Sequence, residues 1–131
     1  MTSILLVEDH KIFAQALLRV LHERGQLEIV AIAESAEEAL EKIPDLEMDL
    51  DLVLVDVSLP ARSGIGLVLA LSERYPDLPC IMLSGHVSQY YARSSLAAGA
   101  RGYLVKDQAN EILEGIQRVL QGEIFVSEEI R

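Results

Sequence analysis

Short apolar segments of this chain alternate with segments of helical periodicity, and several of the apolar segments end in a reactive polar residue. The segments are continuously apolar, which is typical of parallel strands covered by helices on both faces. The four clearest cases are Ile4–Val7 before Glu8 and Asp9, Leu52–Val55 before Asp56, Cys80–Leu83 before Ser84, and Tyr103–Val105 before Lys106. The carboxyl ends of parallel strands lie along one edge of a sheet, where ligands bind. The pattern therefore predicts an α/β domain that gathers these polar residues in one pocket.

The rest of the chain agrees with a (βα)5 fold of five parallel strands and five helices. A strand over 27–33 contains a glutamate and is expected at the sheet edge. Gly25 is placed to end the first helix, and Pro44 to close the second, which opens at the capping box of Ser35 and Glu38. The inner stripe of the first helix is expected to be Phe13, Ala16, Leu17, Val20 and Leu21. Further helices are expected at about 64–74, 88–98 and 109–121.

Composition excludes several classes of function. With 131 residues and a net charge of −10, the chain lacks the clustered Lys and Arg that hold a nucleic-acid backbone. The acidic run of Asp45, Glu47, Asp49 and Asp51 is interpreted as a solvated loop. Cys80 lies in an apolar segment and is expected to be buried and inert. No apolar segment is long enough for a membrane span, and the first is too short for a signal peptide, so we expect a cytoplasmic protein.

The predicted pocket suits phosphate chemistry on an aspartate. Glu8, Asp9 and Asp56 would crowd three carboxylates together, which is unfavourable unless a cation neutralises them. Mg²⁺ fits, because it prefers oxygen ligands and also binds phosphate oxygens. Asp56 is the candidate nucleophile that would form an aspartyl-phosphate. The metal, the ammonium of Lys106 and the hydroxyl of Ser84 would each hold one phosphoryl oxygen. Taken singly, these residues also suit helix caps, turns or an ordinary surface lysine; the ordered set favours the pocket.

With these residues in place, the chain resembles the receiver domains of two-component response regulators. The matching features are the acid pair of Leu-Leu-Val-Glu8-Asp9, Asp56 with Leu59-Pro60, Gly64, Ser84-Gly85, and Gly102-Tyr103-Leu104-Val105-Lys106. The resemblance implies a flavodoxin-like fold with strand order 2-1-3-4-5. It also implies that a sensor histidine kinase transfers a phosphoryl group to Asp56 in a Mg²⁺-dependent reaction. Such a domain is a phosphoacceptor in signalling rather than an enzyme, apart from its self-phosphotransfer and autodephosphorylation.

The resemblance assigns further roles. Asp9, Asp56 and the backbone carbonyl of Ser58 would bind the metal directly, and Glu8 would act through water. Ser84 and Tyr103 correspond to the switch pair of the family, in which the hydroxyl moves toward the phosphate and the aromatic side chain turns inward. In this interpretation the face of the fourth helix and last strand shifts between two pre-existing states. The chain departs from the commonest pattern in having Glu8 at the first acid position. His86 occupies a variable position beside the pocket and is interpreted as a rim residue.

The end of the chain resembles the branch of regulators with a C-terminal LuxR/FixJ-type helix-turn-helix output domain. We expect residues 1–121 to form the receiver domain. Residues 122–131 are expected to be a tail without a fold of its own, which begins a linker to an output domain absent from this chain. DNA binding and transcription regulation would then belong to the parent protein.

Two other functions and two dimer surfaces stay open at this point. A receiver-like interaction module that works without phosphate would need only its surface. An aspartate-nucleophile phosphatase of the haloacid dehalogenase type needs a second Asp two residues after the nucleophile, where this chain has Ser58. A homodimer would use either the first and last helices or the face of the fourth helix.

Overall fold

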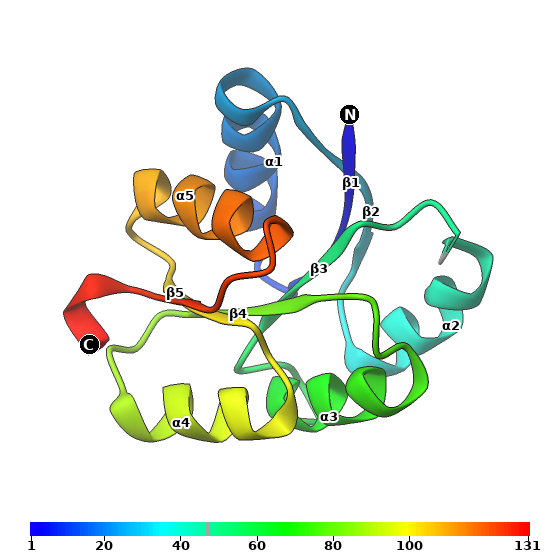
Figure 1. The fold of residues 1–131 in the computed structure, drawn as a ribbon. Helices are drawn as coiled ribbons and strands as arrows, with labels where there is room; N and C mark the ends of the chain where they lie inside the picture. Colours follow the sequence, from blue (N-terminus) through cyan, green and yellow to red (C-terminus); the bar gives the residue numbers. More distant parts are fainter. Residues whose placement is uncertain (47) are drawn as a thin grey trace.

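The computed structural model describes residues 1–46 and 48–131, and these form a parallel sheet between two layers of helices (Figure 1). The elements are β1 (Thr2–Val7), α1 (Lys11–Gly25), β2 (Leu27–Ala33), α2 (Ala36–Leu46), β3 (Leu52–Asp56), α3 (Gly64–Arg74), β4 (Cys80–Ser84), α4 (Gln89–Ala98), β5 (Gly102–Val105), α5 (Ala109–Leu120), β6 (Phe125–Val126) and a 3-10 turn, η1 (Glu128–Ile130). The strand order in the sheet is β2-β1-β3-β4-β5-β6, and all of these pairs are parallel. The predicted order 2-1-3-4-5 is therefore confirmed, with one additional strand.

The central strands are apolar throughout because both of their faces are covered. In β1, Ile4 and Leu6 pack into the core beneath α1 and α5, whereas Leu5 and Val7 pack into the core beneath α2, α3 and α4. All four side chains have no exposed surface. Figure 1 shows α1 and α5 on one side of the sheet and α3 and α4 on the other. The charged strand β2 lies at the edge of the sheet, as its glutamate predicts.

The helix boundaries agree with the sequence patterns, with small corrections. Helix α1 ends at Gly25, but the left-handed residue that follows is Gln26, with a φ of 54°. Its buried stripe contains Ala14, Leu17 and Leu21, and the predicted Ala16 is exposed. Helix α2 continues past Pro44 to Leu46, so Pro44 lies inside its last turn. Pro44 has no backbone N–H to donate, so α2 lacks one hydrogen bond in this turn, yet the helix continues for two more residues.

The capping box, Cys80 and the acidic run can each be compared with the structure. The capping box forms in a shifted version: Ser35 Oγ accepts a hydrogen bond from Glu38 N–H, and the Glu38 carboxylate accepts one from Glu34 N–H. Cys80 is buried as predicted, and burial raises the pKa of its thiol to about 12. Asp45 lies in α2 rather than in the expected acidic loop, and Glu47 lies outside the described residues. No helix among the described residues is long and apolar enough to cross a membrane.

The prediction that residues 122–131 have no fold of their own is wrong. Strand β6 pairs with β5, with Gly102 opposite Phe125 and Tyr103 opposite Val126. Phe125 and Ile130 are buried against the two cores, since they are 6% and 5% exposed. These apolar side chains explain the docking, because a hydrophilic linker would have no surface to bury.

Candidate functional site

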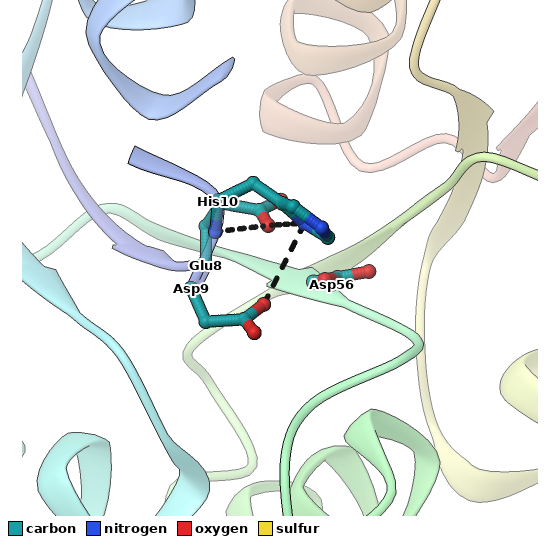
Figure 2. A group of neighbouring side chains, drawn as sticks. All are labelled: Glu8, Asp9, His10 and Asp56. Atoms are coloured by element: carbon teal, nitrogen blue, oxygen red, sulfur yellow. Dashed lines mark hydrogen bonds and ion pairs between the residues drawn. The ribbon is translucent and has the colours of Figure 1, made fainter. Parts of the chain in front are cut away.

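The carboxyl edge of the sheet brings together charged residues from three separate strand ends. Glu8 follows β1, Asp56 ends β3, and Lys106 follows β5. Glu8 and Asp56 are each only 1% exposed. Figure 2 shows Glu8, Asp9 and His10 on the loop after β1, facing Asp56 on the neighbouring strand. The neighbouring positions follow from the direct pairing of β1 with β3, in which Val7 lies opposite Val55.

The acidic side chains of this edge are arranged as ligands for a cation. One potential ligand atom from each of Glu8, Asp9, His10 and Asp56 lies within 4.8 Å of the others. Three buried carboxylate oxygens in this group, Glu8 Oε1, Asp9 Oδ1 and Asp56 Oδ2, have no hydrogen-bond partner among the residues that the structure describes. Oxygens of like charge that are buried without hydrogen bonds are unfavourable unless they are neutralised. A hard, oxygen-preferring cation such as Mg²⁺ fits this set of donor atoms.

Lys106 neutralises part of this charge. Its Nζ lies 2.8 Å from Glu8 Oε1 and 3.4 Å from Asp56 Oδ2, and its side chain is 17% exposed. Both contacts have the distance of an ion pair but lack hydrogen-bond geometry, because both carboxylate oxygens remain without a hydrogen bond. The ammonium is therefore held by its charge beside these two oxygens.

Asp56 is held with one oxygen bound and the other open. Its Oδ1 accepts a hydrogen bond of 3.1 Å from the backbone N–H of Ser58. Burial, reinforced by the charge of Glu8, raises the pKa of the Asp56 carboxyl, and the Ser58 N–H and Lys106 act in the opposite direction. Additional positive charge beside Asp56 would therefore favour the ionised form of its carboxyl.

The loop after Asp56 packs tightly against the backbone of Asp56. A Cβ placed on Gly64, at the start of α3, would lie 2.1 Å from the backbone oxygen of Asp56, so only glycine fits there. Ala61 has a φ of 63°, in a turn closed by a hydrogen bond from Arg62 N–H to the Pro60 carbonyl. Strained backbone of this kind is frequent near functional sites. Ser58 is exposed, and it contacts Asp56 through its backbone N–H.

Ser84 and Tyr103 meet at the backbone of His86 rather than at the carboxylates. Ser84 Oγ accepts a hydrogen bond from His86 N–H at 2.9 Å and donates one to the His86 carbonyl at 3.2 Å. The Tyr103 hydroxyl donates to the same carbonyl at 3.4 Å. The Tyr103 side chain is fully buried, and burial raises the pKa of its phenol. Thus the structure places the two side chains of the predicted switch pair on one shared acceptor, with the aromatic ring turned inward.

Sequence reasoning missed His10. Its Nδ1 lies 3.1 Å from Glu8 Oε2 and 3.7 Å from Asp9 Oδ1, and its side chain is 68% exposed. The signal was available, because His10 directly follows the acid pair at the end of β1. His86, interpreted as a rim residue, is exposed, and only its backbone groups contact Ser84 and Tyr103.

Comparison with known proteins agrees with this geometry. Residues 4–117 match the family model of the response regulator receiver domain. The chain is 31% identical over 125 residues to the transcriptional regulatory protein DegU of Brevibacillus brevis, covering 95% of this chain and 52% of that protein. It is 36% identical over 107 residues to the DNA-binding transcriptional activator DevR/DosR of Mycobacterium tuberculosis, covering 82% of this chain and 48% of that protein. The chain thus spans about half the length of these two relatives.

A solved structure shows the same fold. The crystal structure of a two-component response regulator of the LuxR family from an Aurantimonas species superimposes with a TM-score of 0.92 at 27% identity, over 99% of this chain and 93% of that one. Together with the family match over most of the chain, the order of the strands and the acidic edge, this likeness identifies the family. The chain belongs to the response regulator receiver domains.

Proposed function

We propose that this domain accepts a phosphoryl group from a sensor histidine kinase onto Asp56, in a reaction that requires Mg²⁺. The observation that carries the proposal is the group of three buried carboxylate oxygens without hydrogen bonds beside the ammonium of Lys106. Such an arrangement stabilises added positive charge and, with it, a phosphoryl group. Receiver domains of this family are signalling domains that generally use Mg²⁺, and the residues present here fit that ion.

Four groups would hold the metal. Asp9, Asp56 and the backbone carbonyl of Ser58 are the proposed direct ligands, and Glu8 is proposed to act through water. Bound Mg²⁺ would supply neutralising charge for the phosphoryl oxygens. It would also oppose the effect of burial on Asp56 and keep that carboxyl ionised, since a nearby cation favours the charged form.

The transfer itself uses the side chains of this chain. Asp56 Oδ2, which has no hydrogen bond, would attack phosphorus while Ser58 N–H holds Oδ1 in place. The new O–P bond forms as the P–N bond of the donor phosphohistidine breaks and the imidazole leaves with the electron pair. Lys106 and Ser84 would each bind one phosphoryl oxygen, which for Ser84 requires its hydroxyl to leave His86.

That movement of Ser84 connects phosphorylation to the output. Ser84 and Tyr103 share the carbonyl of His86, so a change at one hydroxyl alters the surroundings of the other. We propose that this pair switches the face formed by α4 and β5. In a parent protein with a helix-turn-helix domain after residue 131, the switch would control DNA-binding transcription regulation in the cytoplasm. The names of the relatives support this proposal, and dimers through α1 and α5 or through α4 are its two candidate assemblies.

The experiment is intact-mass spectrometry after incubation with acetyl phosphate and Mg²⁺. We expect wild type to gain one phosphate, about 80 Da, and to lose the adduct in hydroxylamine, as an acyl phosphate does. EDTA and Asp56→Asn should each abolish the gain. Asp77→Asn, an exposed aspartate in the loop after α3, is the matched control and should behave like wild type.

A second donor tests the partner. Purified phosphorylated histidine kinase should transfer its label to wild type and not to Asp56→Asn. Absence of an adduct with both donors, together with no response of the amide NMR spectrum to beryllofluoride, would refute the proposal and favour an interaction module that works without phosphate.

A further inference from the structure

The ammonium of Lys106 has a third neighbour besides the two carboxylates. Its Nζ lies 4.8 Å from the centroid of the Phe13 ring, over the face of that ring. Phe13 belongs to the first turn of α1 and packs against the core formed by α1 and α5, so the ring is anchored on its other side. One aromatic face of α1 thus covers a charge that belongs to the loop after β5.

This contact matters because the ion pairs of Lys106 lack hydrogen-bond geometry. Its ammonium lies 2.8 Å from Glu8 Oε1 and 3.4 Å from Asp56 Oδ2, yet neither oxygen receives a hydrogen bond from the part of the chain that the structure describes. The four-carbon stem of lysine is flexible, so charge alone does not fix the position of the ammonium. A ring at 4.8 Å adds an attraction that requires no particular N–H direction.

The attraction from the ring also persists during the reaction. The negative charge of Asp56 is consumed when its oxygen bonds to phosphorus, and the charge of Glu8 would be shared with the metal. The negative face of an aromatic ring does not change in either step. Phe13 therefore offers Lys106 a partner that is the same before and after transfer.

We propose that Phe13 is a positioning residue that holds the ammonium of Lys106 at the phosphoryl site. This inference rests on the proposed function of Asp56 and extends it to a residue of α1. Its chemistry is a cation–π contact, with Lys106 still free to donate its N–H groups to phosphoryl oxygens.

The experiment compares Phe13→Leu, which keeps an apolar side chain but loses the ring, with Phe13→Tyr, which keeps the ring. At saturating Mg²⁺ we expect Phe13→Leu to slow phosphorylation by acetyl phosphate about three- to tenfold, the range of an ordinary cation–π contact. Phe13→Tyr should restore the rate to within about twofold of wild type. The Phe13 ring should shift the ε-methylene NMR signal of Lys106 upfield in wild type, and this signal should return to its usual position only in Phe13→Leu.

Phe125→Leu is the matched control. In wild type the Phe125 ring also lies beneath a cation, with Arg131 Cζ 4.9 Å from the ring centroid. Phe125 belongs to β6 and not to the acidic edge. Phe125→Leu should leave the Lys106 signal and the phosphorylation rate of the folded protein unchanged. Equal slowing in Phe125→Leu or in Phe13→Tyr would overturn the positioning role, because general damage to packing would then explain the loss.

Two readouts keep this proposal separate from the proposed function. A wild type that takes up no phosphate refutes phosphotransfer to Asp56 and, with it, any role of Phe13 in that reaction. A wild type that is phosphorylated, together with an unchanged rate and an unchanged Lys106 signal in Phe13→Leu, refutes the role of Phe13 alone.

Discussion

Strand β5 lies between two regions that differ in whether their buried polar groups are hydrogen-bonded. At its carboxyl end, Lys106 faces one oxygen of Glu8 and one of Asp56, and neither of these two oxygens has a hydrogen bond among the described residues. Along the outer edge of β5, residues 122–131 (the C-terminal segment) form hydrogen bonds with its backbone. Ser127 N–H donates to the Tyr103 carbonyl at 2.9 Å, and Val105 N–H donates to Ser127 Oγ at 2.9 Å. Ser127 is fully buried, as are most residues of β5.

This difference in hydrogen bonding distinguishes a region suited to ligand binding from a region that stabilises the fold. Buried charge without hydrogen bonds weakens the free domain and is useful only when a ligand neutralises it. Buried polar groups that are paired stabilise the fold and leave nothing for a ligand to bind. The acidic edge therefore has the character of a site, and the C-terminal segment that of a structural element.

The largest expected effect tests the C-terminal segment as part of the core. Phe125→Ala should lower the free energy of unfolding by about 3–5 kcal/mol, because it removes a buried aromatic side chain and leaves a cavity. Urea unfolding measures the change. Its neighbour Ile124 is 67% exposed, so Ile124→Ala is the control and should change stability by less than about 0.5 kcal/mol. Equal losses in the two variants would show that the segment is not packed in solution.

The next effect tests the acidic edge as a cation site. Mg²⁺ at one hundred times its Kd should raise the free energy of unfolding by about 2.7 kcal/mol relative to EDTA, since it binds only the folded state. Thermal unfolding at matched ionic strength measures this gain. Asp9→Asn should lose most of it, because an amide contributes no charge to the site. A gain that is equal in wild type and Asp9→Asn would place the bound ion elsewhere.

A smaller effect concerns the paired groups of β5. Ser127→Ala leaves the buried N–H of Val105 without an acceptor and should reduce stability by about 1–3 kcal/mol. Amide hydrogen exchange should show a selective loss of protection at Val105. Unchanged exchange there would mean that another acceptor replaces the serine, and that the segment is less specific than its contacts indicate.

In the absence of metal, the free energy of unfolding should depend on pH through the carboxyl of Asp56, which is the smallest of the expected effects. The folded pKa of Asp56 is raised above its ordinary value of 3.8, mainly by burial, so the folded state holds this proton more tightly than the unfolded state. Its contribution should therefore make stability fall as pH rises from about 3.8 toward the folded pKa. The difference between wild type and Asp56→Asn in EDTA, followed by urea unfolding, isolates this carboxyl. A difference that rises with pH would mean that Lys106 outweighs burial.

Much of the fold could be predicted because its signals are local. Each continuously apolar strand and each helical stripe is set by residues close together in sequence, as in β1 and α3. The gathering of Glu8, Asp56 and Lys106 at one edge followed from the parallel sheet alone. The end of α2 was predicted wrongly from Pro44, because a proline makes a helix end probable but the helix here continues to Leu46.

The C-terminal segment could not be predicted in the same way. Phe125 and Val126 are too few to show a strand period, and their pairing with β5 depends on an edge that only the assembled sheet provides. The placement of Phe13 over Lys106 likewise joins α1 to the loop after β5, and no local pattern encodes it.

The sequence by itself determined the alternation of strands and helices, the edge at which the acidic residues collect, and the residue types suited to a cation and a phosphoryl group. Only the tertiary structure decided that β5 is covered by a sixth strand, that the ammonium of Lys106 meets a ring and two carboxylates, and that Ser84 and Tyr103 share one carbonyl. The physical reason is range. Periodicity and strand ends depend on neighbours along the chain, whereas these contacts depend on how distant segments pack once the two cores have formed.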